Sequence, residues 1–164
     1  MAEHRYLIAL GSNIRHHRHG PPEQVLRAAL GEMEREDLTV ERVSPIVRSA
    51  PLGPSRRRYA NAVAVIGCQL QPSRLLDTLK AIEARFGRRR GGRWNARVLD
   101  LDIVLWERGA FADAGLVVPH RLFRERRFVL EPADAVAPDW RDPISGLTVR
   151  HLRARLTRRR AAPR

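Results

Sequence analysis

The chain has 164 residues, of which 43% are hydrophobic, and this is typical of one folded domain rather than a disordered chain. Its formal net charge is +13, carried by 31 Lys and Arg against 18 Asp and Glu, and Lys80 is the only lysine. Such a charge favours an anionic partner and does not choose between nucleic acid, an acidic membrane surface and a phosphate-rich small molecule. A uniform arginine bias also follows from genome composition, so most of these arginines are expected to be solvated.

Cysteine usage and hydropathy indicate a cytoplasmic protein. Cys68 is the only cysteine, so no internal disulfide is possible, and its place in "NAVAVIGCQL" predicts a buried, reduced thiol. No apolar run approaches the ~20 residues of a membrane span. The N-terminal "MAEHRYLIALGSN" lacks the basic-then-apolar order of a signal peptide.

The first third of the chain predicts a strand, a loop and a helix. "RYLIALGSN" (5–13) has the composition of a strand closed by a turn, and the polar "IRHHRHGPP" (14–22) that of a loop. Three histidines of this loop, at 16, 17 and 19, have a spacing that matches no standard zinc site, so a solvated patch is favoured over a metal site. A helix is expected from Pro22 to near Asp37. Its apolar stripe comprises Val25, Leu26, Ala29, Leu30 and Met33.

The next elements repeat the strand and helix patterns. "LTVERVSPIVRSAP" (38–51) predicts an extended segment broken at Pro45, followed by the loop "SAPLGPSRRR" and the strand "YANAVAVIGCQL" (59–70). Pro72 begins a second helix, which Gly87 ends. The buried stripe expected on that helix comprises Leu75, Leu76, Leu79, Ile82 and Phe86.

A third strand, within "RWNARVLDLDIVLW" (93–106), follows the loop "RRRGGRWNA". The resulting β-α-β-β-α-β order predicts an α+β fold with a ferredoxin-like sheet and helices on one face. The C-terminal extension is expected to contain a loop and short helix (118–140), a hairpin (141–149) and a basic helix or tail from 149. No repeat or linker divides the chain, so residues 1–164 are expected to form a single domain with a basic tail from about residue 157.

Two aspartates inside this strand are the first candidate site. Alternation places Leu99, Leu101, Ile103 and Leu105 on one face, and Val98, Asp100, Asp102 and Val104 on the other. The two carboxylates then stand about 6 to 7 Å apart, where they repel each other and are costly to desolvate. A cation is therefore expected between them. Arginine partners would make a structural ion network, whereas Mg²⁺ would bridge the pair to a polyphosphate.

The surrounding sequence favours the second interpretation, although D-x-D alone is a weak signal. Guanidinium groups pair bidentately with phosphate oxygens, and phosphoryl-type transfer depends mainly on positioning and charge neutralisation. Gly91 and Gly92 give the preceding loop the freedom to close over a bound polyphosphate. The basic residues lie upstream at Arg88, Arg89, Arg90, Arg93 and Arg97, and downstream at His120, Arg121, Arg124, Arg126 and Arg127.

Four motifs in order, "LIALGSN", "APLGPSRRRYANAV", "GRRRGGRWNARVLDLDIVLW" and "VPHRLFRERRFVLEPADAVAP", resemble those of the 6-hydroxymethyl-7,8-dihydropterin pyrophosphokinase family. The resemblance runs from about Tyr6 to Val149. It implies a ferredoxin-like α+β fold and an enzyme of folate biosynthesis. It further implies transfer of the terminal diphosphate of ATP to the pterin hydroxymethyl group, release of AMP, and two Mg²⁺ ions.

The resemblance also implies residue roles. Asp100 and Asp102 would bind magnesium, and with Arg88 and Arg97 they would be catalytic. The ATP contacts would be Glu83, Arg90, Trp94, Arg97, His120 and Arg126, with Glu83 on the exposed side of the second helix. The pterin contacts would be Ser49, Ala50, Leu52, Tyr59, Asn61, Trp94 and Phe128. Core packing is the alternative for the two aromatic residues Trp94 and Phe128, and a strand-edge hydrogen bond the alternative for Asn61.

Two other classes compete with a pterin kinase. A basic ferredoxin-like domain that binds RNA on its sheet would stack bases on sheet aromatics, yet here the strand presents Asp100 and Asp102, which repel phosphate unless metal intervenes. A metal-dependent nuclease or nucleotidyltransferase would also use paired aspartates, but leaves Asn61, Trp94 and Phe128 without a shared role. The expected partners are therefore ATP and the pterin, without specific nucleic acid or membrane, and a monomer is expected.

Overall fold

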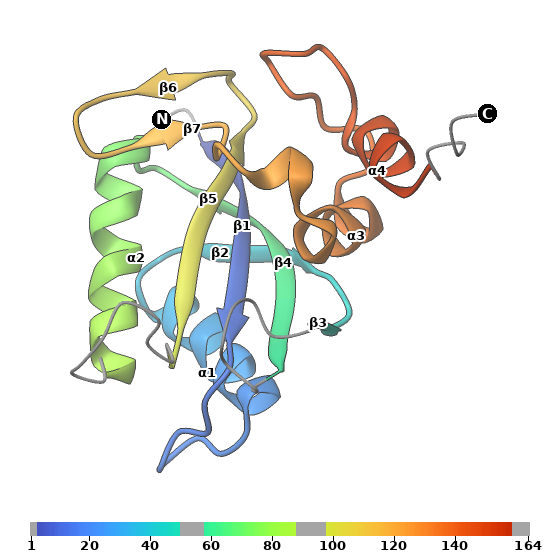
Figure 1. Ribbon diagram of the computed structural model, residues 1–164. Coiled ribbons are helices and arrows are strands. Elements are labelled where there is room, and N and C mark those ends of the chain that lie inside the picture. The colour runs from blue at the N-terminus through green and yellow to red at the C-terminus, as the bar shows by residue number, and fades with distance from the viewer. Residues whose placement is uncertain (1–2, 50–57, 88–97, 159–164) are drawn as a thin grey trace.

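The structure is a computed structural model, and it describes residues 3–49, 58–87 and 98–158 (Figure 1). Six residues with expected roles lie outside these ranges, namely Ala50, Leu52, Arg88, Arg90, Trp94 and Arg97. Within the described ranges, every helix is too short or too polar to cross a membrane.

An antiparallel sheet forms the centre of the molecule. Its strands are β1 (His4–Ser12), β2 (Thr39–Val43), β3 (Val47–Ser49), β4 (Tyr59–Cys68) and β5 (Asp100–Trp106). They are ordered β2-β4-β1-β5, and β3 pairs with β4 beside β2. The extended segment broken at Pro45 therefore supplies two short strands to one neighbour. The α+β class expected from the sequence is confirmed.

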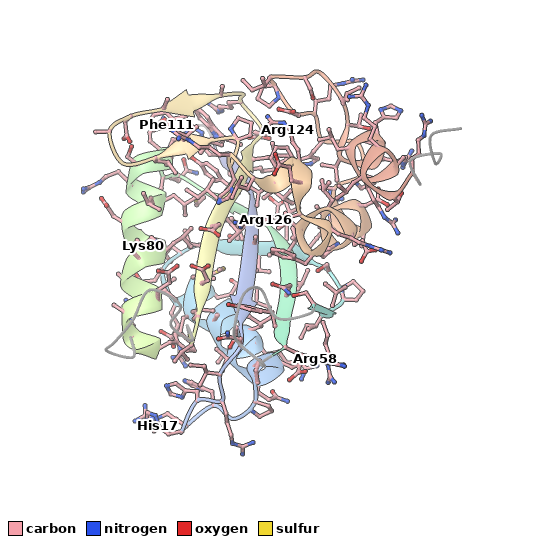
Figure 2. All side chains as sticks on the ribbon, in the orientation of Figure 1. His17, Arg58, Lys80, Phe111, Arg124 and Arg126 are labelled. Atoms are coloured by element: carbon pink, nitrogen blue, oxygen red, sulfur yellow. The ribbon has the colours of Figure 1, made fainter. Side chains whose placement is uncertain are left out.

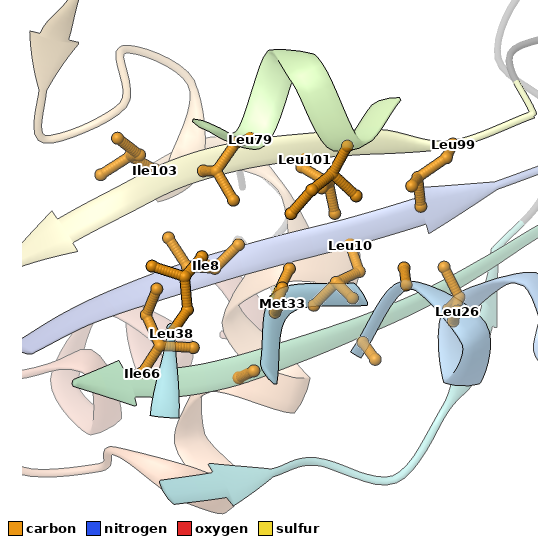
Figure 3. Packing of buried hydrophobic residues seen from close by; sticks show 14 of the residues in the cluster. Ile8, Leu10, Leu26, Met33, Leu38, Ile66, Leu79, Leu99, Leu101 and Ile103 are labelled. Atoms are coloured by element: carbon orange, nitrogen blue, oxygen red, sulfur yellow. The ribbon is translucent and has the colours of Figure 1, made fainter. Parts of the chain in front are cut away.

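The first face of the sheet is covered by α1 (Pro22–Arg35) and α2 (Pro72–Phe86). Figure 3 shows Ile8 and Leu10 of β1 packed between side chains from both helices and from β5. The helical spacing found in the sequence is confirmed, because the buried apolar side chains of α1 and, after Pro72 at its start, of α2 belong to the expected stripes. Glu83 of α2 is also buried and was not expected to be. Gly87 ends α2 with φ +89°, a conformation that favours glycine.

The second face of the sheet is also buried. The C-terminal extension covers it with η1 (Phe123–Glu125), α3 (Arg127–Val136) and α4 (Val149–Thr157), which lie across the sheet from α1 (Figure 1). The expectation of helices on one face holds for α1 and α2 but not for the extension. Alternate residues of β1 and β4 are apolar on both faces, so each face needs a cover. The strand residues under the extension are Leu7, Val63, Val65, Val104 and Leu105.

A bulge in β5 changes the expected alternation. Leu7 of β1 pairs with Leu105 and the next residue, Ile8, pairs with Ile103, so Val104 is the extra residue. Leu105 consequently packs on the second face with Val104, and the prediction that it shares a face with Ile103 is wrong. Val98 precedes the strand and packs in the first cluster, which also differs from the expected alternation.

The histidine-rich loop is a tight turn in which His17 and Arg18 are exposed, as a solvated patch requires, and His16 is not. Backbone hydrogen bonds of 2.8 and 2.9 Å join His16 and Gly20, and the His16 Nδ1 accepts the N–H groups of Arg18 and His19, each at 3.1 Å. His16 is buried, and its ring packs edge-on against Phe86. Within residues 3–49, 58–87 and 98–158, no three metal-binding side chains gather.

The C-terminal extension is anchored by one buried ion pair. Arg124 donates to both oxygens of Asp142, at 2.6 and 2.7 Å, and Ser145 and the Ile144 N–H also donate to this carboxylate. Burial raises the pKa of Asp142, but the hydrogen bonds from Arg124, Ser145 and Ile144 outweigh it and hold the pKa at about 2. The pair fixes η1 and therefore the segment that carries Arg126.

One element was not anticipated from the sequence. β6 (Phe111–Ala112) and β7 (Val117–Val118) form a short hairpin after β5. The Asp113 carboxylate closes its turn by accepting the N–H groups of Gly115 and Leu116, both at 2.8 Å. The hairpin leads into His120, whose N–H donates to the Val104 carbonyl at 3.0 Å. It thereby positions His120 beside β5.

Candidate active site

The aspartates of β5 lie on the second face of the sheet, beyond the part that α3 covers. Leu101 between them is fully buried on the first face, whereas Asp100 and Asp102 are each partly exposed. Opposite them, β1 presents small residues, with Ala9 paired to Asp102 and Gly11 paired to Asp100. The strand alternation predicted from the sequence therefore places both carboxylates at an open, uncrowded end of this face.

The carboxylate pair is electrostatically costly without a further cation. Burial raises the pKa of Asp102, and the neighbouring charge of Asp100 raises it further. The basic side chains of His120, Lys80 and Arg126 act in the opposite direction and do not offset the rise in the Asp102 pKa. Figure 2 shows Lys80 and Arg126 on opposite sides of β5. Two hard oxygen donors with this residual repulsion fit a divalent cation.

The His120 ring is oriented towards the carboxylates by the backbone N–H of Leu122. Its Nδ1 accepts the Leu122 N–H at 3.2 Å, so the ring proton is assigned to Nε2, which lies 3.9 Å from an Asp102 oxygen. Burial lowers the pKa of His120, opposed by Asp102 and aided by Arg126. The Nε2–H directed at the site can donate to an anionic ligand.

The basic residues downstream of β5 divide into two groups. Arg124 is held by Asp142, and Arg127 pairs with Glu131, so both have carboxylate partners within the protein. Arg126 instead lies near Asp102, and its guanidinium carbon is 5.6 Å from the centroid of the Phe128 ring. The structure thus brings together Arg126 and Phe128, two residues with expected roles towards different substrates.

Glu83 does not lie where the sequence placed it. It was expected on the exposed side of α2, but it is only 8% exposed, and its Oε1 accepts the Leu101 N–H at 2.7 Å. The Lys80 ammonium lies 3.1 to 3.2 Å from its two oxygens. Lys80 was not among the expected site residues. Its spacing of three residues from Glu83 on a helix, as the chain's only lysine, was the signal that could have identified it.

A second polar group lies on the same face, two strands away. The Asn61 Nδ2 donates to the Ser49 hydroxyl at 2.8 Å, and Ser49 pairs with Tyr59 across β3 and β4. Asn61 is 5% exposed and lies on the interior strand β4, and its side chain bonds to the short strand β3 beside it. Three of the expected pterin contacts are therefore neighbours.

Gly11 connects the two groups. It pairs with Asn61 on one side and with Asp100 on the other, which puts these residues about 10 Å apart at the ~4.8 Å strand spacing. A Cβ at Gly11 would lie 3.3 Å from the Asn61 Oδ1. A side chain at this position would therefore crowd the floor of the site, which explains the glycine of "LGSN".

Comparison with known proteins identifies the family. The sequence model of the 7,8-dihydro-6-hydroxymethylpterin-pyrophosphokinase (HPPK) family matches residues 7–138. The chain belongs to this family. The matched HPPK segment contains every residue of the site described above, from Gly11 to Phe128.

Relatives support the same assignment. The chain is 39% identical over 150 residues to 2-amino-4-hydroxy-6-hydroxymethyldihydropteridine pyrophosphokinase of Synechocystis sp., covering 91% of this chain and 74% of the relative. It is 42% identical over 141 residues to the protein of the same name from Pseudomonas aeruginosa, covering 85% of this chain and 84% of the relative.

Solved structures show the fold. The HPPK-DHPS of Plasmodium falciparum matches with a TM-score of 0.74 over 94% of this chain, at 13% sequence identity. The chain spans 45% of the length of that protein, so the likeness concerns the fold of one part of it.

The charge repulsion in the site predicts a gain in stability when one carboxylate is neutralised. Asp102→Asn should raise the urea midpoint of the metal-free protein at pH 7, because burial and Asp100 disfavour the ionised form. Addition of Mg²⁺ should stabilise the original protein and not the variant. Asp77→Asn, at an exposed site on α2, is the control and should change stability by less than about 0.5 kcal/mol. A lower midpoint for Asp102→Asn would show that the pair is a satisfied structural network.

Proposed function

We propose that this chain transfers diphosphate from ATP to the hydroxymethyl group of 6-hydroxymethyl-7,8-dihydropterin and releases AMP, in tetrahydrofolate biosynthesis. The single observation that carries the proposal is the register of β1, which sets a polar pocket at Asn61 and a carboxylate pair at Asp100 on either side of Gly11. Family membership indicates which reaction is catalysed, and the polar groups at Asn61 and at Asp100 are the proposed binding sites of its two substrates. ATP is the co-substrate.

A ferredoxin-like assignment of the sheet is part of this proposal. If β2 and β3 are counted as one bent strand, the chain order is β-α-β-β-α-β. β1 then lies between β4 and β5, and α1 and α2 pack on one face. Residues 1–164 would form a single domain, which we propose is a cytoplasmic monomer.

We assign Mg²⁺ to Asp100 and Asp102, with two ions as the expected number. Mg²⁺ in phosphate-transferring sites is held by one or two carboxylates and completed by substrate phosphates and water, so a pair of aspartates is a sufficient protein donor set. The raised pKa of Asp102 is the observation that fits: burial and then the charge of Asp100 disfavour its ionised form, and a bound dication would favour that form. When bound, the metal neutralises polyphosphate charge and orients the chain of phosphates.

The phosphate contacts are proposed to come from two segments of the chain, the C-terminal extension and residues 88–97. His120 and Arg126 approach from the C-terminal extension, and their cationic or donor groups face the pair. We retain Arg88, Arg90, Trp94 and Arg97 as proposed contacts to ATP, with Arg88 and Arg97 catalytic. Positive groups placed around the transferring diphosphate stabilise the charge that spreads over its oxygens.

The pterin is proposed to lie at the Asn61 end of the face. The amide of Asn61 has donor and acceptor groups that match the amide edge of the heterocycle, and its bond to Ser49 fixes its orientation. Phe128 is half-buried and would stack on the flat ring, facing Trp94 on the other side. Tyr59, and the backbone groups at Ser49, Ala50 and Leu52, would complete the pocket.

In the reaction, the pterin hydroxyl oxygen attacks the β-phosphorus of ATP. The bond from that phosphorus to the oxygen bridging the α- and β-phosphates breaks, AMP leaves with this oxygen, and the hydroxyl proton is released. The residues of the site position the two substrates, and their charges neutralise the diphosphate as it moves. The roughly 10 Å between Asn61 and Asp100 allows the heterocycle and the phosphates to lie side by side.

The RNA-binding alternative is not supported. An RNA-binding sheet of this kind presents an open face with stacking aromatics, whereas here α3 and α4 cover much of the second face. The open remainder carries Asp100 and Asp102. Family membership accounts for these residues without nucleic acid.

The product of the reaction tests the proposed function. With Mg²⁺, ATP and 6-hydroxymethyl-7,8-dihydropterin, the protein should form AMP and diphosphorylated pterin in equal amounts, measured by chromatography. Asp100→Asn and Asp102→Asn should each lower kcat on the order of 10²- to 10³-fold, while circular dichroism shows an intact fold. Formation of ADP, or tight RNA binding without turnover, would contradict the proposal.

The pterin pocket makes a separate prediction. Asn61→Ala should weaken pterin binding by about 1 to 3 kcal/mol in calorimetry, because the heterocycle loses its hydrogen-bonding partner. Binding of an ATP analogue should be unchanged. Ser49→Ala removes only the group that orients Asn61 and should have a smaller effect. Equal pterin affinity in Asn61→Ala and the original protein would assign Asn61 a structural role.

A further inference from the structure

The amide between the two aspartates is held by a side chain from α2. β5 ends the strand order β2-β4-β1-β5, so among residues 3–49, 58–87 and 98–158 no strand of this sheet pairs with its outer edge. The Leu101 N–H on that edge donates to the Glu83 Oε1 at 2.7 Å. Because Leu101 is fully buried, its amide would otherwise lack a partner away from water, which is costly.

Glu83 is itself held in place. The Lys80 ammonium lies 3.2 Å from Oε1 and 3.1 Å from Oε2, one helical turn away. Hydrogen bonds to a charged carboxylate are shorter and stronger than those between neutral groups. The pair therefore connects α2 to the backbone N–H of Leu101, the residue between Asp100 and Asp102.

We propose that Glu83 is a positioning residue that acts through the Leu101 amide to set the direction of both carboxylates. A rotation of the peptide units on either side of Leu101 would turn Asp100 and Asp102 relative to each other. The inference rests on the proposed function, since it concerns the geometry of that site. It replaces direct contact with ATP as the role of Glu83.

Direct contact with ATP fits Glu83 poorly. Only 8% of the residue is exposed, and both oxygens already have partners. A carboxylate facing polyphosphate would also repel it. Lys80, which is 43% exposed and acts electrostatically on Asp102, is the member of the pair that can approach a phosphate.

The chain provides a matched control for this bond. Glu34 of α1 accepts the Val40 N–H of β2 at 2.8 Å, which is also a helix carboxylate on the amide of an edge strand. β2 lies at the opposite edge of the sheet from Asp100 and Asp102. The Glu34 bond is exposed and the Glu83 bond is buried, so loss of the Glu34 bond controls for removal of a helix carboxylate from an edge-strand amide, without affecting the proposed site.

The test compares Glu83→Leu, Glu83→Gln, Glu34→Leu and Glu34→Gln. Amide hydrogen exchange at Leu101 and Val40 is measured by NMR in the metal-free protein, Mn²⁺ affinity by electron paramagnetic resonance, and kcat and KM for ATP by AMP release. Gln retains an oxygen that can accept the amide, whereas Leu removes the acceptor and retains the bulk. The exchange measurement needs neither ATP nor turnover, so its failure is distinguishable from failure of the proposed function.

Glu83→Leu should accelerate exchange at Leu101 by about tenfold or more. It should lower Mn²⁺ affinity and kcat by about 10- to 100-fold, with KM for ATP changed less than about threefold. Glu83→Gln should restore most of the Mn²⁺ affinity and of kcat that Glu83→Leu loses. The Glu34 variants should change amide exchange at Val40 alone. If Glu83→Leu does not fold, Leu101 exchange and the KM for ATP of Glu83→Gln decide between a positioning role and direct contact with ATP. Unchanged Leu101 exchange with a KM for ATP raised more than about tenfold in Glu83→Gln would overturn the inference and make Glu83 a direct ligand.

Discussion

Repulsion between two carboxylates on one strand is the constraint on which the rest of the site depends. Asp100 and Asp102 share a face of β5, and the cost of their charges decides what surrounds them. Ala9 and Gly11 oppose them with little bulk, and cations approach from α2 and from the C-terminal extension. Because these basic groups do not offset the rise in the Asp102 pKa, a further positive ion beside the two carboxylates would lower the electrostatic cost of their charges. The fold thus holds two carboxylates close together at an electrostatic cost, which the metal of a metal–polyphosphate complex would lower.

The second face of the sheet has an apolar half that packs in the core and a polar half that carries the candidate active site. Its apolar half lies under α3 and stabilises the fold, while its polar half continues past the end of that helix. The same three strands supply both halves, so the position of the site is fixed by the register that builds the core. The ion pair between Arg124 and Asp142 then sets the loop of Arg126 over this boundary. Substrate groups would meet a surface whose backbone is already ordered by the core.

Local patterns in the sequence predicted much of this arrangement. Period-two alternation placed Asp100 and Asp102 together, and helical spacing identified the buried stripes of α1 and α2. The Val104 bulge was not predictable, because it depends on pairing with β1, and it moved Leu105 to the other face. The burial of Glu83 was missed for a similar reason, since its partner Leu101 lies 18 residues away on another element. The roles of Asn61 and Phe128 came from resemblance, because spacing alone does not reveal a shared pocket between distant strands.

The most direct measurement of the central claim is the position of a bound divalent cation. Mn²⁺ can substitute for Mg²⁺, and anomalous diffraction from crystals grown with Mn²⁺, an ATP analogue and the pterin would locate it. The account predicts strong peaks about 2.1 Å from carboxylate oxygens of Asp100 and Asp102, beside the phosphates of the analogue. Peaks elsewhere, such as at the His16–Gly20 turn, with Asp100 and Asp102 paired only to arginines, would contradict it.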